Sequence, residues 1–334
     1  MKIDASIGAD LNTVSKQAKW LEEVGYDGVL SFETSHDPFL PLVLAAEHTN
    51  DVDILTSIAV AFARNPMTLA NLGHDLNSYS KGRFKMGLGS QIRPHITRRY
   101  SMPWSHPAAR MRELILALHA IWDCWYDGKP LDFRGDYYAH TLMTPMFTPT
   151  DSQYGRPDVI LAAVGPKMTE TAAEVADGLL IHSFTTEKYI REITVPTIEK
   201  TLKKYDRDRA NFELVYPIFA VTADTEESFE AIKTATCKQI AFYGSTPSYK
   251  GVLDLHGWGD LQPELNRLSK AGKWDEMGTL ITDDILNAFA VVGEPESVAN
   301  AIRTRYGDLI DRATVQFTGI KKERIPELMA IVRG

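Results

Sequence analysis

The sequence predicts a (β/α)8 barrel, and three observations carry that prediction. Short apolar runs recur along the chain, and each is followed by a segment whose apolar residues have helical spacing. Several runs, such as Asp53–Val60, are apolar on both faces, as is typical of parallel strands covered by helices. Eight strand–helix units fit within the 334 residues, which is the number that closes a barrel. A doubly wound open sheet is the rival arrangement.

The first half of the chain holds four of these units. Helix boundaries are marked by ordinary signals: Gly25 ends the first helix, and Asn65-Pro66 opens the third. The expected strands are Lys2–Ile7, Gly28–Phe32, Asp53–Val60 and Arg83–Leu88. The helix after the fourth strand is long, from Ala108 to Asp127, with Leu114, Leu118, Ile121 and Trp125 on one stripe.

The second half continues the alternation with longer interruptions. The expected strands are Val159–Ala163, Gly178–His182, Phe212–Thr222 and Ala313–Phe317. We expect helices at about 165–176, Thr185–Tyr205, Thr225–Tyr243, Glu294–Tyr306 and Glu323–Val332. No linker or repeat divides the chain, so residues 1–334 are expected to form one domain, with insertions at about 90–107, 131–157 and 244–285.

Composition excludes several classes of function. The net charge is −8 and the Lys and Arg residues are dispersed, so nucleic acid is not expected as a partner. No apolar stretch approaches the roughly 20 residues of a membrane helix, and the start of the chain lacks a signal-peptide pattern. Cys124 and Cys237 lie far apart outside any CxxC, which favours free thiols in the cytoplasm. The nine histidines show no metal-ligand spacing, so no metal is expected.

A barrel carries its site where the strands end, and the second strand ends in Glu33-Thr34-Ser35-His36-Asp37. Two carboxylates and an imidazole within five residues are suited to moving a proton. The alternative is a helix cap and turn, because Asp37-Pro38 precedes a helix. We take Glu33 and His36 as the candidate catalytic residues.

A second candidate segment follows the fifth strand. Ala163-Val164-Gly165-Pro166 places small residues at a strand end and Gly-Pro at a helix start. Backbone N–H groups at such a helix start are suited to binding a phosphate. The alternative is a tight connection that needs glycine for its backbone angles.

The chain resembles the bacterial luciferase-like superfamily and, within it, the coenzyme F-420-dependent oxidoreductases. The resemblance spans nearly the whole chain and rests on the order and spacing of several segments. These are Gly25-Tyr26-Asp27-Gly28-Val29 before Glu33, Leu55 to Ala59 with Arg64-Asn65-Pro66, Ser80 to Gly89, Phe133 to Tyr138, Ala162 to Pro166, and Ala176-Asp177-Gly178.

The resemblance implies a barrel whose C-terminal mouth holds a flavin or deazaflavin ring. It implies a cis peptide at Ser57-Ile58 behind the ring, and cofactor contacts from Gly89-Ser90-Gln91 and from Ala163, Val164, Gly165 and Pro166. We add His182, which ends the sixth strand at the same face, and Arg64. The family's acid–His pair falls on Glu33-Thr34, so the acid is kept and His36 is the substitute for the missing histidine. Gln91 stands near the place of a glutamate in the sugar-phosphate enzymes, which disfavours glucose 6-phosphate.

The resemblance leaves three functions open. The first is hydride transfer between coenzyme F-420 and a small organic substrate, with Lys167, Arg93, Arg98, Arg99 and Arg64 near the cofactor's acidic tail. The second is an FMN-dependent monooxygenase served by a flavin reductase. The third is an idle, flavin-binding barrel. By the family's precedent, and because residues Leu42 to Ala46 are strongly apolar, we also expect a homodimer.

Overall fold

A computed structural model describes all residues 1–334 and shows the expected barrel. Eight parallel strands surround a common core, and the pairings β1–β13 and β3–β5 close the ring. In order around the barrel they are β1 (Lys2–Ser6), β2 (Gly28–Ser31), β3 (Asp53–Thr56), β5 (Phe84–Gly89), β8 (Asp158–Ala163), β9 (Gly178–Ile181), β10 (Glu213–Pro217) and β13 (Arg312–Thr314). The open-sheet alternative is therefore excluded.

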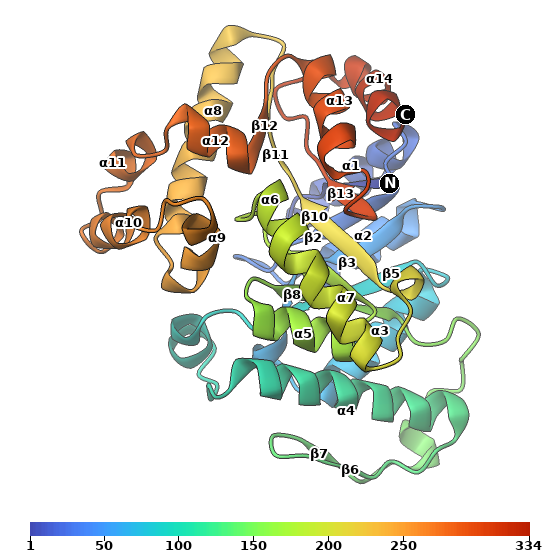
Figure 1. The fold of residues 1–334 in the computed structure, drawn as a ribbon. Coiled ribbons are helices and arrows are strands. Elements are labelled where there is room, and N and C mark those ends of the chain that lie inside the picture. Colours follow the sequence, from blue (N-terminus) through green and yellow to red (C-terminus); the bar gives the residue numbers. More distant parts are fainter.

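Helices cover the outside of the barrel, and the two termini lie close together (Figure 1). They are α1 (Leu11–Glu23), α2 (Phe39–His48), α3 (Pro66–Tyr79), α4 (Pro107–Asp127), α5 (Pro166–Val175), α6 (Glu187–Tyr189), α7 (Val195–Lys204), α13 (Pro295–Tyr306) and α14 (Ile325–Arg333). None of the helices in the chain is long and apolar enough to cross a membrane. Cys124 and Cys237 are free thiols, as expected.

Two expected strands are shorter than the sequence suggested. The run Asp53–Val60 divides into β3 and β4 (Ala59–Val60), because the chain changes direction at Ser57-Ile58. The run Phe212–Thr222 divides into β10 and β11 (Phe219–Val221). The latter leaves the barrel and pairs with β12 (Ala290–Val292), a strand that the sequence reading did not expect.

The third insertion forms a lobe of its own. It contains the end of α8 (Glu226–Gly244), then α9 (Lys250–Leu255), α10 (Leu261–Lys270), α11 (Trp274–Thr279) and α12 (Asp283–Phe289). These helices project to one side of the barrel (Figure 1) and enclose a separate core of 15 buried residues. At the bottom of the view in Figure 1, the second insertion forms the hairpin β6 (Phe133–Arg134) and β7 (Ala139–His140) against α4.

Charged residues pack inside the barrel near the start of its strands. Arg312 of β13 is fully buried and contacts Asp4 of β1, Asp53 of β3 and Glu213 of β10. Gly28 of β2 provides the space for this group, because a Cβ there would lie 2.4 Å from Asp4 Oδ1. The opposite end of the barrel, where the strands finish, is left for the site.

Candidate active site

All strands of the barrel are parallel, so their C-terminal ends meet at one mouth. The sequence-predicted residues lie there. Glu33 follows β2, Ser57 follows β3, Ser90 follows β5, Val164 follows β8 and His182 follows β9. The structure therefore brings together residues that are almost 150 positions apart in the chain.

The peptide bond between Ser57 and Ile58 is cis, as expected. It lies between β3 and β4, and the Ile58 side chain turns toward β5. A Cβ on Gly89 would come within 2.9 Å of two Ile58 side-chain atoms, so only glycine fits at that position without a shift. The cis segment and the end of β5 thus form one close-packed surface at the mouth.

Glu33 joins three of the loops around the mouth. Its Oε2 atom accepts hydrogen bonds from the backbone N–H of Val60 and from Nη1 of Arg64, both at 2.7 Å. Its Oε1 atom accepts a hydrogen bond from the Tyr100 hydroxyl at 2.8 Å. The Glu33 side chain is only 6% exposed. It therefore fixes the loops after β2, β3 and β5 relative to one another.

The charge of Glu33 is balanced within this cluster. Arg64 pairs with Glu33 and, through Nη2, with Asp37 Oδ2 at 2.9 Å. The guanidinium also lies over the Phe39 ring, 5.4 Å from its centroid. Asp37 in addition accepts the N–H of Phe39 in a local turn, but the N-cap position of α2 is Pro38 and carries no side-chain cap, so the expected helix cap does not form. Arg64 is therefore engaged by protein carboxylates.

His36 differs from Glu33 in its surroundings. Its side chain is exposed at the mouth, and its ring has no hydrogen-bond partner within the chain. The neighbouring loop is held instead through Thr34, whose carbonyl accepts a hydrogen bond from Arg99. The imidazole is therefore accessible to a ligand at the mouth.

The loop after β5 has an unusual backbone and carries several cations. Gln91 adopts a φ of 58° and its Oε1 accepts the N–H of Ile92, so this side chain is turned back onto its own loop. The π-helical turn His95–Arg99 follows and positions Tyr100. Burial and the hydrogen bond to Glu33 both raise the pKa of the Tyr100 hydroxyl.

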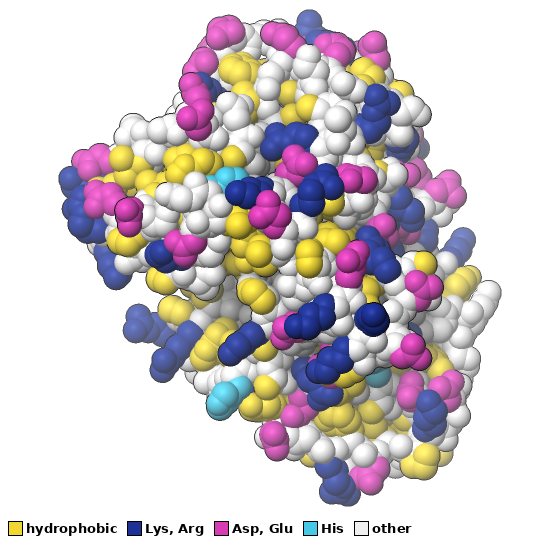
Figure 2. Space-filling view, viewed as in Figure 1, with side chains coloured by type: hydrophobic (Ala, Val, Ile, Leu, Met, Phe, Trp, Pro, Cys, Tyr) yellow, Lys and Arg dark blue, Asp and Glu magenta, His cyan; other side chains and the backbone are white.

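The side chains of Arg93, Arg98 and Arg99 on this loop are exposed. Dark blue side chains gather beneath a hollow under the insertion lobe, in the region of this loop (Figure 2). One side of the mouth is therefore basic.

The start of α5 is suited to holding an anion. Its first residues follow Gly165 without any side-chain cap, and a Cβ on Gly165 would meet nothing within 4 Å. The N–H groups at this helix end thus border open space. Beside it lies a cavity of about 10 Å³, roughly one water in size.

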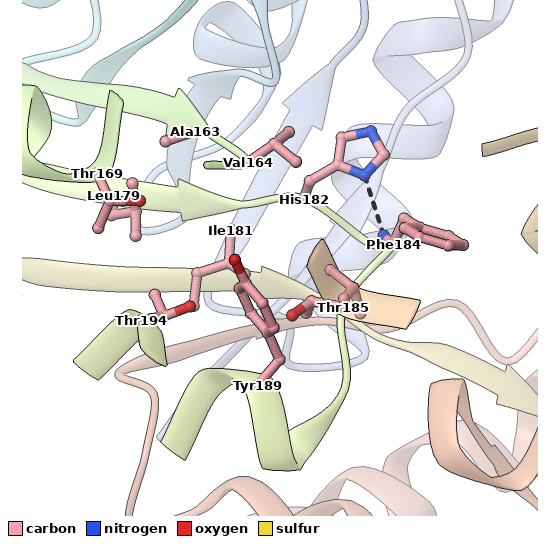
Figure 3. A pocket seen from close by; sticks show the side chains of 11 residues that line it. Ala163, Val164, Thr169, Leu179, Ile181, His182, Phe184, Thr185, Tyr189 and Thr194 are labelled. Atoms are coloured by element: carbon pink, nitrogen blue, oxygen red, sulfur yellow. Dashed lines mark hydrogen bonds between the residues drawn. The ribbon is translucent and has the colours of Figure 1, made fainter. Parts of the chain in front are cut away.

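Ala163, Val164 and Thr185 are among the residues that line this cavity, and the buried Thr185 hydroxyl has no hydrogen-bond partner. Figure 3 shows the hydroxyl groups of Thr185, Tyr189 and Thr194 beside Ile181.

His182 is held in a fixed orientation at the end of β9. Its Nδ1 atom accepts the N–H of Phe184 at 3.0 Å (Figure 3), and its Nε2 atom lies 3.4 Å from the Tyr249 hydroxyl. The rings of Tyr243 and Tyr249 pack against the imidazole, with centroids at 4.7 and 4.8 Å. Burial lowers the pKa of His182 to about 4, so the ring is neutral at physiological pH.

Sequence reasoning missed three contributors to the site. Tyr100 lies in an Arg-rich loop, and no spacing rule connects it with Glu33. Thr185 was read only as a helix start. Tyr249 lies in the insertion at 244–285, and nothing in the sequence places it against His182. The contacts of Tyr100 and Tyr249 join segments 60 or more residues apart, beyond the reach of periodicity.

The chain belongs to the luciferase-like monooxygenase family, whose family model matches residues 3–312. It is 52% identical to an uncharacterized protein of Mycobacterium tuberculosis over 325 residues, which cover 97% of this chain and 96% of the relative. A putative coenzyme F-420-dependent oxidoreductase of the same organism is 25% identical over 294 residues, covering 83% of this chain and 82% of that protein.

Solved structures share the fold. The coenzyme F-420-dependent tetrahydromethanopterin reductase of Methanopyrus kandleri matches with a TM-score of 0.79 at 19% identity, over 98% of this chain and 96% of that one. An F-420-dependent secondary alcohol dehydrogenase, solved with an F-420–acetone adduct, matches with a TM-score of 0.75 at 17% identity, over 100% and 99% of the two chains. At these identities the likeness concerns the barrel itself.

Proposed function

We propose that this protein is an oxidoreductase that uses coenzyme F-420 to transfer a hydride to or from a small organic substrate. The observation that carries the proposal is the uncapped start of α5 beside the unpartnered Thr185 hydroxyl, with an arginine-bearing loop after the neighbouring strand β5. A phosphate followed by an acidic tail matches that distribution of donors and charges. The F-420-dependent proteins among the relatives described above support it.

The proposal assigns residues to each part of the cofactor. The loop Ala163–Pro166 would hold the phosphate, and the packed surface of Ser57, Ile58, Gly89, Ser90 and Gln91 would lie behind the ring. Arg93, Arg98 and Lys167 would contact the acidic tail. When bound, the deazaflavin supplies the hydride acceptor or donor, while the chain binds, orients and exchanges a proton.

The two candidate catalytic residues receive different tasks. Glu33 already accepts three hydrogen bonds, so it would hold the mouth in shape and keep the cis segment in place. His36 has a free ring and would exchange the proton. Arg64, engaged by Glu33 and Asp37, would act through Glu33. His182, neutral and fixed, would border the cofactor loop.

A second candidate function is an FMN-dependent monooxygenase that receives reduced flavin from a reductase. Two observations favour it: the description of the matching family, and the fold shared with an EDTA monooxygenase of Chelativorans at a TM-score of 0.72 and 13% identity, over 100% of this chain and 93% of that one. A phosphate at α5 would serve FMN equally well. Only coenzyme F-420 carries an acidic tail, so contacts to that tail distinguish it from FMN.

Titration of the purified protein with each cofactor, followed by fluorescence, tests the proposal. We expect coenzyme F-420 to bind at micromolar concentrations and FMN more weakly. Replacing Arg93 and Arg98 by serine should weaken F-420 binding by roughly ten-fold if each lost contact is worth about 0.7 kcal/mol. The matched control is Arg134→Ser, which removes an exposed cation from the β6–β7 hairpin. Micromolar FMN binding without detectable F-420 binding would favour the monooxygenase.

A further inference from the structure

A run of aromatic rings leads from the mouth of the barrel to the surface of the insertion lobe. His182 contacts Tyr243 and Tyr249, with ring centroids 4.7 and 4.8 Å away. Tyr243 continues to Phe242 at 5.6 Å, and Phe242 to Trp274 at 6.1 Å. Phe242 and Trp274 are 50% and 49% exposed.

The hydrogen bonds at the inner end of this run have a defined direction. The Phe184 N–H donates to His182 Nδ1, so a neutral ring carries its own proton on Nε2. That N–H faces the oxygen of Tyr249 and donates to it. The Tyr249 hydroxyl proton is then not used within the chain, and it is available to an acceptor on a ligand.

Two lysines beside the aromatic run are already paired with carboxylates. Near Trp274, Lys238 contacts Asp275 at 2.6 Å. Close to Tyr249, Lys250 contacts Asp254. The free arginines lie across the mouth, on the loop after β5. The insertion side therefore presents aromatic rings and the hydroxyl protons of Tyr243 and Tyr249, and the lysines beside Trp274 and Tyr249 are paired with carboxylates.

We propose that the insertion lobe selects a planar aromatic aldehyde or ketone, with the ring against Tyr243 and Phe242 and the carbonyl oxygen accepting a hydrogen bond from Tyr249. This inference names the substrate class and rests on the proposed function. Its physical basis is that stacked or edge-on rings recognise a flat apolar molecule, while a hydroxyl donor among them selects those that carry an acceptor.

Three matched probes test the two parts of the proposal separately. Acetophenone has both the ring and the acceptor, cyclohexyl methyl ketone has the acceptor without the flat ring, and ethylbenzene has the ring without the acceptor. Ligand-observed NMR titration of the full chain gives their relative affinities, with and without saturating coenzyme F-420. We expect acetophenone to bind at least five-fold more tightly than either of the others.

Variants assign the binding to this surface. Tyr249→Phe should weaken acetophenone binding about five-fold and leave ethylbenzene unchanged, since only the hydroxyl is lost. Phe242→Leu should weaken both aromatic probes by about three-fold. The control is Tyr205→Phe, a partly exposed tyrosine at the end of α7, which should change neither. Three outcomes would overturn the inference: equal affinities for the three probes, no binding of any probe, or an unchanged affinity of Tyr249→Phe for acetophenone.

One measurement is independent of any ligand. The ¹⁵N shifts of His182 should show an unprotonated Nδ1 and a protonated Nε2 at neutral pH, and the opposite tautomer would overturn the direction of the hydrogen bonds. The probe titrations also separate this inference from the proposed function. Loss of F-420 binding with retained selection of acetophenone would reject the cofactor alone, whereas normal F-420 binding without that selection would reject the substrate class.

Discussion

The Nη1 atom of Arg64 lies 2.7 Å from the Oε2 atom of Glu33, and both side chains are largely buried at the mouth of the barrel. This pair connects the loop after β2 with the first residues after β4. Val60 and Tyr100 donate hydrogen bonds to the same carboxylate, so the pair also fixes the position of the loop after β5. The geometry of the candidate site thus depends on an ion pair within the chain and does not require a bound ligand.

Replacing Arg64 by methionine should therefore damage stability as well as the site. The Glu33 carboxylate would stay buried without its cation, and the free energy of unfolding should fall by about 3 kcal/mol. Glu33→Gln should cost less, because the amide oxygen can still accept the Val60 N–H. Urea unfolding measures both. The control is Arg191→Met, which breaks an exposed pair with Asp308 and should cost under about 1 kcal/mol.

Replacing His36 should lower activity and leave stability almost unchanged. Its exposed ring has no partner in the chain, so His36→Asn should change the free energy of unfolding by less than about 0.5 kcal/mol. If it exchanges the substrate proton, turnover should fall by roughly 10²-fold or more. Turnover is followed as reoxidation of reduced F-420 by acetophenone. Unchanged turnover of His36→Asn would show that another group exchanges the proton. It would not affect the assignment of the fold as a barrel.

The order of strands and helices was predictable because burial on both faces leaves a strong periodic signal. The family resemblance also led to the cis bond at Ser57-Ile58, which the structure shows. The failures have a common physical origin. β12 is three residues long and is a strand only because β11 leaves the barrel to pair with it, and local propensity does not record such a partner.

The site was predictable in location and less so in role. Position at a strand end placed Glu33 at the mouth, but its partner Tyr100 comes from a turn 67 residues later. The apolar run Leu42 to Ala46 predicts a dimer surface, but the structure buries Leu42, Ala45 and Ala46 in the barrel's own core. Sequence periodicity distinguishes an apolar face from a polar one and does not tell which neighbour covers it.

Acid should destabilise the protein through two histidines. Burial lowers the pKa of both His182 and His119 to about 4, from 6.5. Between those values the unfolded chain binds these protons and the folded chain does not, so stability is fully present above pH 6.5 and declines as the pH falls toward 4. Each group contributes up to roughly 3 kcal/mol to this loss.

Urea unfolding at several pH values between 4 and 7 checks this prediction. His182→Gln and His119→Gln should each flatten the decline, and the double variant should flatten it further, because the two side chains belong to separate parts of the barrel. A stability that stays constant from pH 7 to pH 4.5 would contradict the assigned burial of both rings.

The buried Arg312 should be among the most sensitive residues for stability. Both nitrogens of its bidentate contact with Asp4 lie within 2.8 Å of the carboxylate, and neither side chain is exposed. Arg312→Met leaves Asp4 buried and unpaired, at a cost of about 3–5 kcal/mol. Adding Asp4→Leu to that variant should restore part of the loss, which a double-mutant cycle would detect. Simple additivity would contradict the pairing.

We predict that the protein is a homodimer, and the structure narrows the surface that this requires. Leu40 and Val43 are 56% and 42% exposed on one face of α2, three positions apart, while the other apolar residues of the helix turn inward. Two adjacent exposed aliphatic side chains favour self-association through this face.

Light scattering at micromolar concentration should give twice the chain mass. The double variant Leu40→Glu with Val43→Lys should return the mass to 37.4 kDa. The control pair Leu142→Glu and Met146→Lys, on the exposed loop after β7, should leave the dimer intact. A wild-type mass of 37.4 kDa would reject the dimer outright.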